Sequence, residues 1–301
     1  SVGYFRPQRI ADVYAVVESI SREGLASITE VCEFMDVNRT AFYAWRSSEP
    51  TVFEEADAEF APLVRIIFKK HRRRYGARRI ASELRDNGHT CSPRKVSEIM
   101  KTLGLRAIQP KSFVPKTTNS RHRLGYAPNL LMEAEAPTRI NQIWVGDITY
   151  IPLEGGIFCY LALLMDLTSR RIVGWSLMDN MTESLVLDAL RNAIKERQPA
   201  VGLIHHTDRG GQYAGNEYRS IMQRSGMRES MSRADNCYDN AFMESHIGTV
   251  KNELEMTEYK CIEDALKEIA EFIRYYNFDR KHSGLGYVTP AQFEQLTQRS
   301  R

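Results

Sequence analysis

The chain has 301 residues, of which 43% are hydrophobic and 26% are charged, a balance that is typical of folded proteins and excludes disorder throughout. No apolar run approaches the roughly 20 residues that a membrane helix needs, and the start of the chain lacks a signal-peptide pattern, so we expect no membrane partner. The five cysteines are scattered without a C-x-x-C pair, which disfavours a disulfide framework or a zinc knuckle and favours a reducing cytoplasm.

The net charge of +3 hides a strong asymmetry along the chain. Residues 65–123 hold 17 Lys and Arg against 3 Asp and Glu, a net of +14, so the remainder carries −11. A segment this basic, with Tyr75, Phe113 and several prolines interleaved, indicates a polyanionic partner such as nucleic acid. A solvated basic face is the ordinary alternative for a short run of Lys and Arg.

Residues 1–60 form a first predicted module of short amphipathic helices. Val13, Val16 and Val17 keep helical spacing, and residues 27–30 have the form of a capping box that opens a second helix. A third short helix follows a turn, and Arg39 at this turn is a candidate DNA contact, because helix–turn–helix units present polar groups from their last helix. Small helical hairpins are about as common without DNA.

Residues 61–106 form a second predicted module of the same type. Ser92 at the N-cap and Pro93 in the first turn predict a helix that runs to about Leu103, after an arginine-rich helix that ends near Gly88. The residues of this module that we expect to face phosphates or base edges are Arg72, Arg73, Arg74, Arg78, Arg79, Arg94 and Lys95.

Residues 107–137 lose all periodicity and are interpreted as an extended, basic, proline-containing linker. Lys111, Lys116, Arg121 and Arg123 are expected to settle along the DNA backbone.

Residues 138–301 are strand-rich and then helical. The patterns predict strands at residues 143–151, 157–167, 171–178, 201–206 and 227–231, and helices at residues 182–195, 216–224, 239–255, 262–276 and from 290. Three adjacent strands, a crossover helix and further strands predict an α/β fold with a mixed five-stranded sheet flanked by helices.

Three acidic residues have settings that suit a metal-dependent phosphoryl-transfer site. Asp147 lies in the first predicted strand, Asp208 ends the strand-like run at residues 201–208, and Glu244 belongs to the helix at residues 239–255; 60 and 35 residues separate them. Carboxylates are ligands that Mg²⁺ prefers, and two ions about 4 Å apart can clamp the attacking and leaving oxygens of a phosphodiester. Each residue taken singly has an ordinary alternative: Asp147 as an edge-strand residue that faces water, Asp208 as a turn cap and Glu244 as a solvated helix residue.

Several neighbours have less distinct roles. Asn240 and Lys251 share the helical face of Glu244 and are candidate contacts to DNA, although a solvated face explains them equally well. His205 and His206 point to opposite faces of a strand and cannot easily share one ion. Either one of them orients Asp208 or its phosphate, or the pair packs in the core. Asp166 is either a turn cap, which we favour, or a further carboxylate near the metals.

Taken together, these stretches resemble the OrfB-type transposases of bacterial insertion sequences (the IS-three group), within the DDE transposase and retroviral-integrase superfamily. The residues that carry the resemblance are 74–80, 92–105, 144–150, 166–175, 206–213, 231–245, 251–253 and 276–290. The resemblance implies a ribonuclease-H-like core, preceded by all-α helix-turn-helix modules, in which Asp147, Asp208 and Glu244 are the triad that binds two Mg²⁺ or Mn²⁺ ions.

It further implies an enzyme of the bacterial nucleoid that cleaves the ends of an insertion sequence and transfers the strands. The expected partners are double-stranded terminal inverted repeats, target DNA, a second copy of the chain in a homodimer or higher assembly on DNA, and an OrfA-type subunit. The sequence begins with Ser and lacks the leucine-zipper region of the full fusion protein, so it is expected to be the downstream reading frame or a fragment. A non-catalytic DNA-binding protein and a metal-dependent ribonuclease or junction nuclease are the alternatives.

Overall fold

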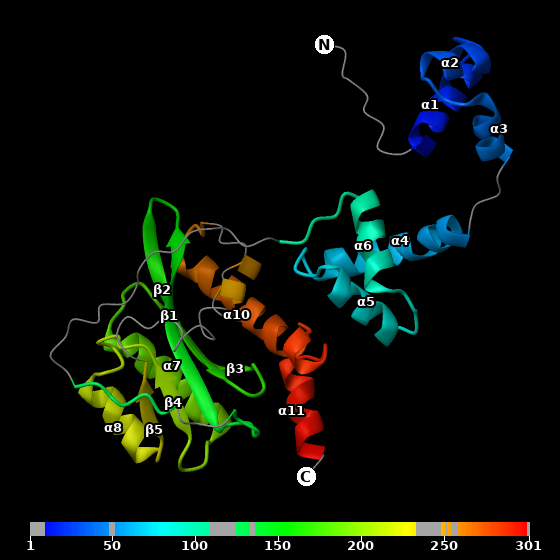
Figure 1. Cartoon of the computed structure of the whole chain (residues 1–301). Helices are drawn as coiled ribbons and strands as arrows, with labels where there is room; N and C mark the ends of the chain where they lie inside the picture. Colours follow the sequence, from blue (N-terminus) through cyan, green and yellow to red (C-terminus); the bar gives the residue numbers. More distant parts are fainter. Residues whose placement is uncertain are drawn as a thin grey trace. The chain divides into compact units, whose positions relative to one another are not determined.

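The computed structural model describes residues 10–47, 52–108 (52–58 in backbone only), 125–132, 136–232, 248–250, 252–254 and 258–299. These residues separate into two compact units, one ending at Arg65 and the other beginning at Ile66 (Figure 1). The division falls within a helix, α4 (Val52–Lys70), which also crosses the expected module boundary at residues 60 and 61. No described helix is both long and apolar enough to span a bilayer.

The first unit contains three short helices, α1 (Ile10–Arg22), α2 (Ile28–Phe34) and α3 (Arg39–Ser47). The predicted capping box is confirmed, because the Ser27 side chain accepts a hydrogen bond from the Glu30 N–H and Glu30 accepts one from the Ser27 N–H. The helices enclose a small apolar core centred on Val17 and Phe42, both fully buried.

The second unit opens with the end of α4 and the helix pair α5 (Ala77–Asp86) and α6 (Pro93–Thr102). Ser92 caps α6 as predicted, since its hydroxyl accepts a hydrogen bond from the Lys95 N–H at 3.2 Å. We refer to these elements, residues 66–102, as the second helical module.

A mixed five-stranded sheet forms the centre of the second unit, in the order β3-β2-β1-β4-β5. The strands are β1 (Ile143–Leu153), β2 (Ile157–Asp166), β3 (Ile172–Met178), β4 (Ile204–Thr207) and β5 (Arg228–Met231). The first three pair antiparallel, whereas β4 pairs parallel with both β1 and β5. The predicted mixed α/β sheet is therefore confirmed.

Helices cover both faces of the sheet, which makes three layers (Figure 1). On one face, α7 (Glu183–Arg197) and α8 (Asn216–Arg224) pack against Trp144 and Ile148 of β1. On the other face, α10 (Ile262–Phe278) packs against the alternate residues of β1, such as Val145 and Ile151. A short 3-10 helix, η2 (Ser283–Leu285), and the helix α11 (Pro290–Arg299) close the chain.

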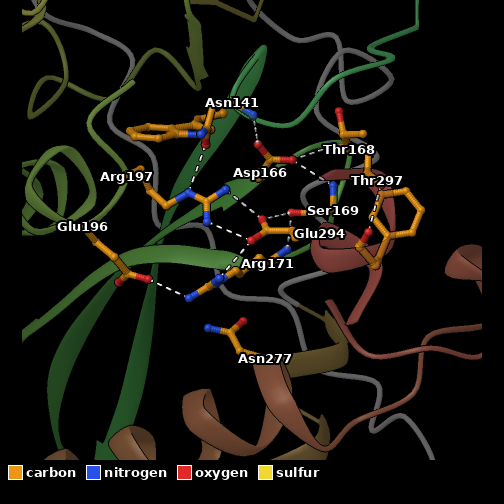
Figure 2. Close-up of polar contacts among 12 residues, drawn as sticks. Asn141, Asp166, Thr168, Ser169, Arg171, Glu196, Arg197, Asn277, Glu294 and Thr297 are labelled. Atoms are coloured by element: carbon orange, nitrogen blue, oxygen red, sulfur yellow. Dashed lines mark hydrogen bonds and ion pairs between the residues drawn. The ribbon is translucent and has the colours of Figure 1, made fainter. Parts of the chain in front are cut away.

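A buried ionic cluster fixes α11 to the sheet (Figure 2). The carboxylate of Glu294 accepts bonds from both Nη atoms of Arg197 at 2.8 and 2.9 Å, from Arg171 at 2.8 Å and from the Ser169 hydroxyl at 2.8 Å. Burial opposes ionisation of this group, but these donors outweigh burial and lower the pKa of Glu294.

Candidate active site

The register of β1 and β4 brings Asp147 and Asp208 to the same level of the sheet. All three recorded pairs, from Ile143 with Ile204 to Val145 with His206, join residues 61 positions apart. Asp208 is 61 positions after Asp147 and follows directly on β4. A Cβ built on Gly146 would meet the side chains of His205 and Thr207, so the register continues toward these aspartates. Neighbouring strands lie about 4.8 Å apart, and residues paired across them share a face.

The face that carries the two aspartates is the one covered by α10. Residues alternate along β1, and Val145, two positions before Asp147, belongs to the core beneath α10. Val250 and Leu254, which follow Glu244 in the chain, pack into this same core. The chain segment after Glu244 therefore returns to the face on which Asp147 and Asp208 lie.

Local backbone bonds orient both carboxylates. Asp147 Oδ1 accepts a bond from the Ile148 N–H at 2.8 Å, and Asp208 Oδ1 accepts one from the Gly210 N–H at 2.9 Å. The buried phenol of Tyr213 lies within electrostatic reach of both: burial, then the charges of Asp208 and Asp147, raise the pKa of Tyr213 well above its usual value. Apart from its place in the motif at residues 206–213, no sequence pattern singled out Tyr213.

Glu244, Asn240 and Lys251 lie outside the residues that the structure describes. Within the described ranges, no group of three His, Cys, Asp or Glu side chains gathers in a way that could hold an ion. Of the predicted triad, the described residues therefore include Asp147 and Asp208.

His205 and His206 both serve as buried packing groups. His205 Nε2 is 2.6 Å from the Tyr218 hydroxyl, and His206 Nδ1 is 2.8 Å from the Ser230 hydroxyl. Burial lowers the pKa of His205 to about 4, so this imidazole is neutral at physiological pH.

Asp166 acts as the turn cap that we favoured. Its carboxylate accepts bonds from the backbone N–H groups of Asn141 at 2.5 Å, Thr168 at 3.0 Å and Ser169 at 2.8 Å (Figure 2). Its cross-strand partner is Trp144, which lies on the opposite face of β1 from Asp147. Asp166 is therefore separated by the sheet from the two aspartates of the candidate site.

Comparison with known proteins gives the family. Models described as "Integrase core domain" match residues 137–237 and 225–290, and a model described as "HTH-like domain" matches residues 54–113. The chain is 40% identical over 267 residues to the "Insertion element IS600 uncharacterized 31 kDa protein" of Shigella sonnei, which covers 88% of this chain and 97% of that protein. It is 35% identical over 272 residues to "Transposase InsF for insertion sequence IS3A" of Escherichia coli (strain K12), covering 89% and 94%.

The chain belongs to the IS3 family of transposases. Among solved structures, the catalytic core domain of HTLV-2 integrase in complex with magnesium is 19% identical, covers 52% of this chain and 98% of that one, and has a TM-score of 0.41. The mixed five-stranded sheet flanked by helices lies within the integrase core matches, and the helix pair α5 and α6 lies within the HTH-like match, as expected for a transposase of this family.

Among the basic residues expected to bind the transposon DNA, Arg39, Arg72, Arg73, Arg78 and Arg94 have exposed side chains and Lys95 is half-buried. Some also have protein partners: Arg39 donates to the Thr29 hydroxyl, Arg72 lies 3.7 Å from Glu268, and Arg94 lies 3.3 Å from Glu98. Lys111, Lys116, Arg121 and Arg123 lie outside the described ranges.

Arg74 and Arg79 differ from their neighbours because their guanidinium groups turn into the transposase. Arg74 Nε donates to the backbone carbonyl of Glu253 at 2.9 Å and packs over the rings of Phe272 and Tyr275. Arg79 Nη1 lies 3.5 Å from the Glu253 carboxylate, and its side chain is 23% exposed. The arginine-rich pattern alone could not separate these two residues from the exposed ones.

Proposed function

We propose that this transposase hydrolyses the phosphodiester at each end of its insertion sequence and then joins the freed 3′-hydroxyl to target DNA, with Asp147, Asp208 and Glu244 as the catalytic triad. The observation that carries the proposal is the register of β1 and β4, which supports the convergence of two carboxylates on one face of the sheet. In the first step water attacks the phosphorus, the bond to the 3′-oxygen breaks, and a 3′-hydroxyl and a 5′-phosphate result. In the second step that 3′-hydroxyl attacks a phosphorus of the target strand, whose own 3′-oxygen leaves and takes up a proton, while the proton of the attacking hydroxyl passes to solvent. No covalent protein intermediate is needed.

The donor set fits hard divalent cations. Asp147 and Asp208 offer carboxylate oxygens, which Mg²⁺ and Mn²⁺ prefer. Asp147, Asp208 and Glu244 would hold two such ions, which when bound polarise the phosphoryl group and activate the attacking hydroxyl. The local bonds from Ile148 and Gly210 would keep the two aspartates in the orientation that ligands require.

The helical modules would bind the terminal inverted repeats, with Arg39, Arg72, Arg73, Arg78, Arg94, Lys95, Lys111, Lys116, Arg121, Arg123, Asn240 and Lys251 as DNA contacts. Two ends must meet before they are joined, so we expect a dimer or larger assembly on DNA. An OrfA-type subunit is a further expected partner.

The test compares the unmodified protein with Asp147→Asn, Asp208→Asn and Glu244→Gln on duplexes that carry the element end, with Mg²⁺ or Mn²⁺. Each variant should lose cleavage and strand transfer by about a hundredfold or more, as when an electrostatic group of an active site is removed, while end binding stays intact. Electron paramagnetic resonance measures the number of Mn²⁺ ions bound per chain. This number should be two in the unmodified protein and lower in each variant.

The matched control is Asp188→Asn, an acidic residue that is half-exposed on α7 and should leave cleavage unchanged. An RNA–DNA hybrid serves as a second substrate. Equal loss of end binding and cleavage in the three variants would show that the carboxylates are structural, and preferential cleavage of the hybrid would favour a ribonuclease.

A further inference from the structure

Within the second unit, buried polar side chains join the second helical module to the part that contains the sheet, α10 and α11, which we call the catalytic unit. Tyr75, between α4 and α5, is fully buried; its hydroxyl accepts a bond from the Lys281 N–H at 2.8 Å and donates one to the Asp279 carbonyl at 3.2 Å. Burial raises the pKa of Tyr75 to about 12, so the phenol keeps the proton that it donates. Its ring stacks on His71 with centroids 3.6 Å apart.

An ionic pair lies beside Tyr75 on the catalytic side. Arg280 binds Glu253 in a two-pronged contact, from Nε to Oε2 at 2.7 Å and from Nη2 to Oε1 at 2.5 Å, and both side chains are almost fully buried. Arg79 of the module reaches the same carboxylate at 3.5 Å, and Arg74 binds the carbonyl of the same residue. Glu253 is therefore shared between the module and the C-terminal part of the chain.

A second pair extends the contact along α5. Lys281 is 5% exposed, and its ammonium group binds the Ser82 hydroxyl at 3.0 Å and the Asp86 carboxylate. We call this set of contacts the polar seam; it comprises Tyr75, Arg79, Ser82 and Asp86 of the module and Glu253, Asp279, Arg280 and Lys281 of the catalytic unit.

The buried ion pairs of the polar seam are better suited to fixing the position of the second helical module than to adding stability. Buried ion pairs add little net stability, because desolvation offsets their attraction, but they hold one geometry and penalise others. Glu253 also follows Glu244 by nine residues, and its neighbour Leu254 packs on the face of the sheet that carries Asp147. The same residue thus touches the module and sits beside the core of the candidate site.

We propose that the polar seam, with Arg79 and Glu253 at its centre, holds the second helical module in a fixed position relative to the catalytic carboxylates, and so selects the phosphodiester that is cut. This inference rests on the proposed function. Arg79 is a positioning residue that does not touch DNA, whereas Arg78, exposed beside it on α5, contacts the DNA backbone.

The two neighbouring arginines give a matched test. Arg79→Met keeps the aliphatic stem and leaves Glu253 paired with Arg280, so no charge is stranded. It should bind the element end within about twofold of the unmodified protein with an unchanged salt dependence, but single-turnover cleavage at saturating DNA should fall about tenfold or more and spread to adjacent phosphates, since small misplacements are costly. Arg79→Lys should recover part of the rate.

Arg78→Met should show the opposite pattern. Its end binding weakens and the slope of log Kd against log salt falls by about one, while the rate and position of cleavage at saturating DNA stay the same. If Arg79→Met instead behaves like Arg78→Met, or if neither its rate nor its cut position changes, the positioning role is wrong.

A second measurement needs no catalysis. Amide hydrogen exchange at residues 279–282 should quicken about tenfold in Arg79→Met and in Tyr75→Phe, with the strands β1 and β2 unaffected. Unchanged exchange in both variants would overturn the seam itself. An unmodified protein that fails to cut the element end, with exchange responding as expected, would instead overturn the proposed function and leave the seam in place.

Discussion

His205 shows how burial on a strand determines the protonation of one side chain. Both of its ring nitrogens lie in the core, one near the Trp144 carbonyl and the other against the Tyr218 hydroxyl. An uncharged ring suits this site because a buried imidazolium would lose its hydration. Its neighbour His206 points to the other face of β4, so identical adjacent residues occupy different environments.

The lowered pKa of His205 predicts a pH-dependent stability. Between its ordinary value of 6.5 and about 4, the unfolded chain binds a proton that the folded chain does not, so the free energy of unfolding falls as pH drops through this window. The loss should be on the order of 3 kcal/mol by pH 4. Chemical denaturation at several pH values measures it. His205→Gln should be less stable at pH 7 yet flatter between pH 6.5 and 4; an unchanged slope would contradict the assignment.

Helix N-caps were predicted correctly where the cap depends only on residues close by in the chain. Ser27 and Ser92 cap the helices that their sequence positions predicted, because a cap needs only the next three residues. Thr182, where the sequence predicted α7 to begin, holds the N-cap position, but its hydroxyl donates to the Asn180 side chain and makes no cap bond. A nearby competing acceptor is invisible to the capping pattern.

The packing of helix α11 against the sheet depends on the carboxylate of Glu294. Glu294 collects the two guanidinium groups of Arg171 and Arg197, and its side chain is 5% exposed (Figure 2). Arg171 also binds Glu196 at 2.8 Å, but that carboxylate is 51% exposed. Arg171 therefore forms one ion pair with a buried carboxylate, that of Glu294, and one with an exposed carboxylate, that of Glu196.

We predict that Glu294→Gln destabilises the second unit by roughly 3–5 kcal/mol, because it leaves the buried guanidinium of Arg197 without a carboxylate and removes the buried one of the two carboxylates that bind Arg171. Glu196→Gln is the matched control and should cost less than about 1 kcal/mol, since solvent screens an exposed pair. Thermal and urea unfolding measure both. Similar losses in the two variants would show that burial does not control the strength of these pairs.

The helix α4 is the element that the sequence patterns missed. Pro62 lies inside it, and an internal proline normally argues against a helix. Val64, Ile67 and Phe68 nevertheless keep helical spacing and are buried. That apolar periodicity was the sequence signal from which the helix could have been predicted. The strands of the sheet were placed within a few residues because their apolar runs are long and bounded by turn residues.

For the whole molecule, the basic segment at residues 65–123 predicts how the transposase binds DNA. Phosphate contacts release counterions, so end binding should weaken about 10³-fold between 50 and 200 mM salt. Replacing Lys111, Lys116, Arg121 and Arg123 together with Gln should lower the slope of log Kd against log salt by about four. A flat salt dependence of the unmodified protein, measured by fluorescence anisotropy, would contradict a DNA role for this segment.

From the sequence alone came the α/β class, the order of the strands and the family, because apolar periodicity, capping residues and motif spacing are properties of neighbouring positions. The tertiary structure was needed to show that β1 and β4 pair in the register that leads toward Asp147 and Asp208, that Asp166 caps a turn, and that Arg79 turns inward to Glu253 while Arg78 faces solvent. Those outcomes depend on strand register and on partners more than a hundred residues away, which no local pattern encodes.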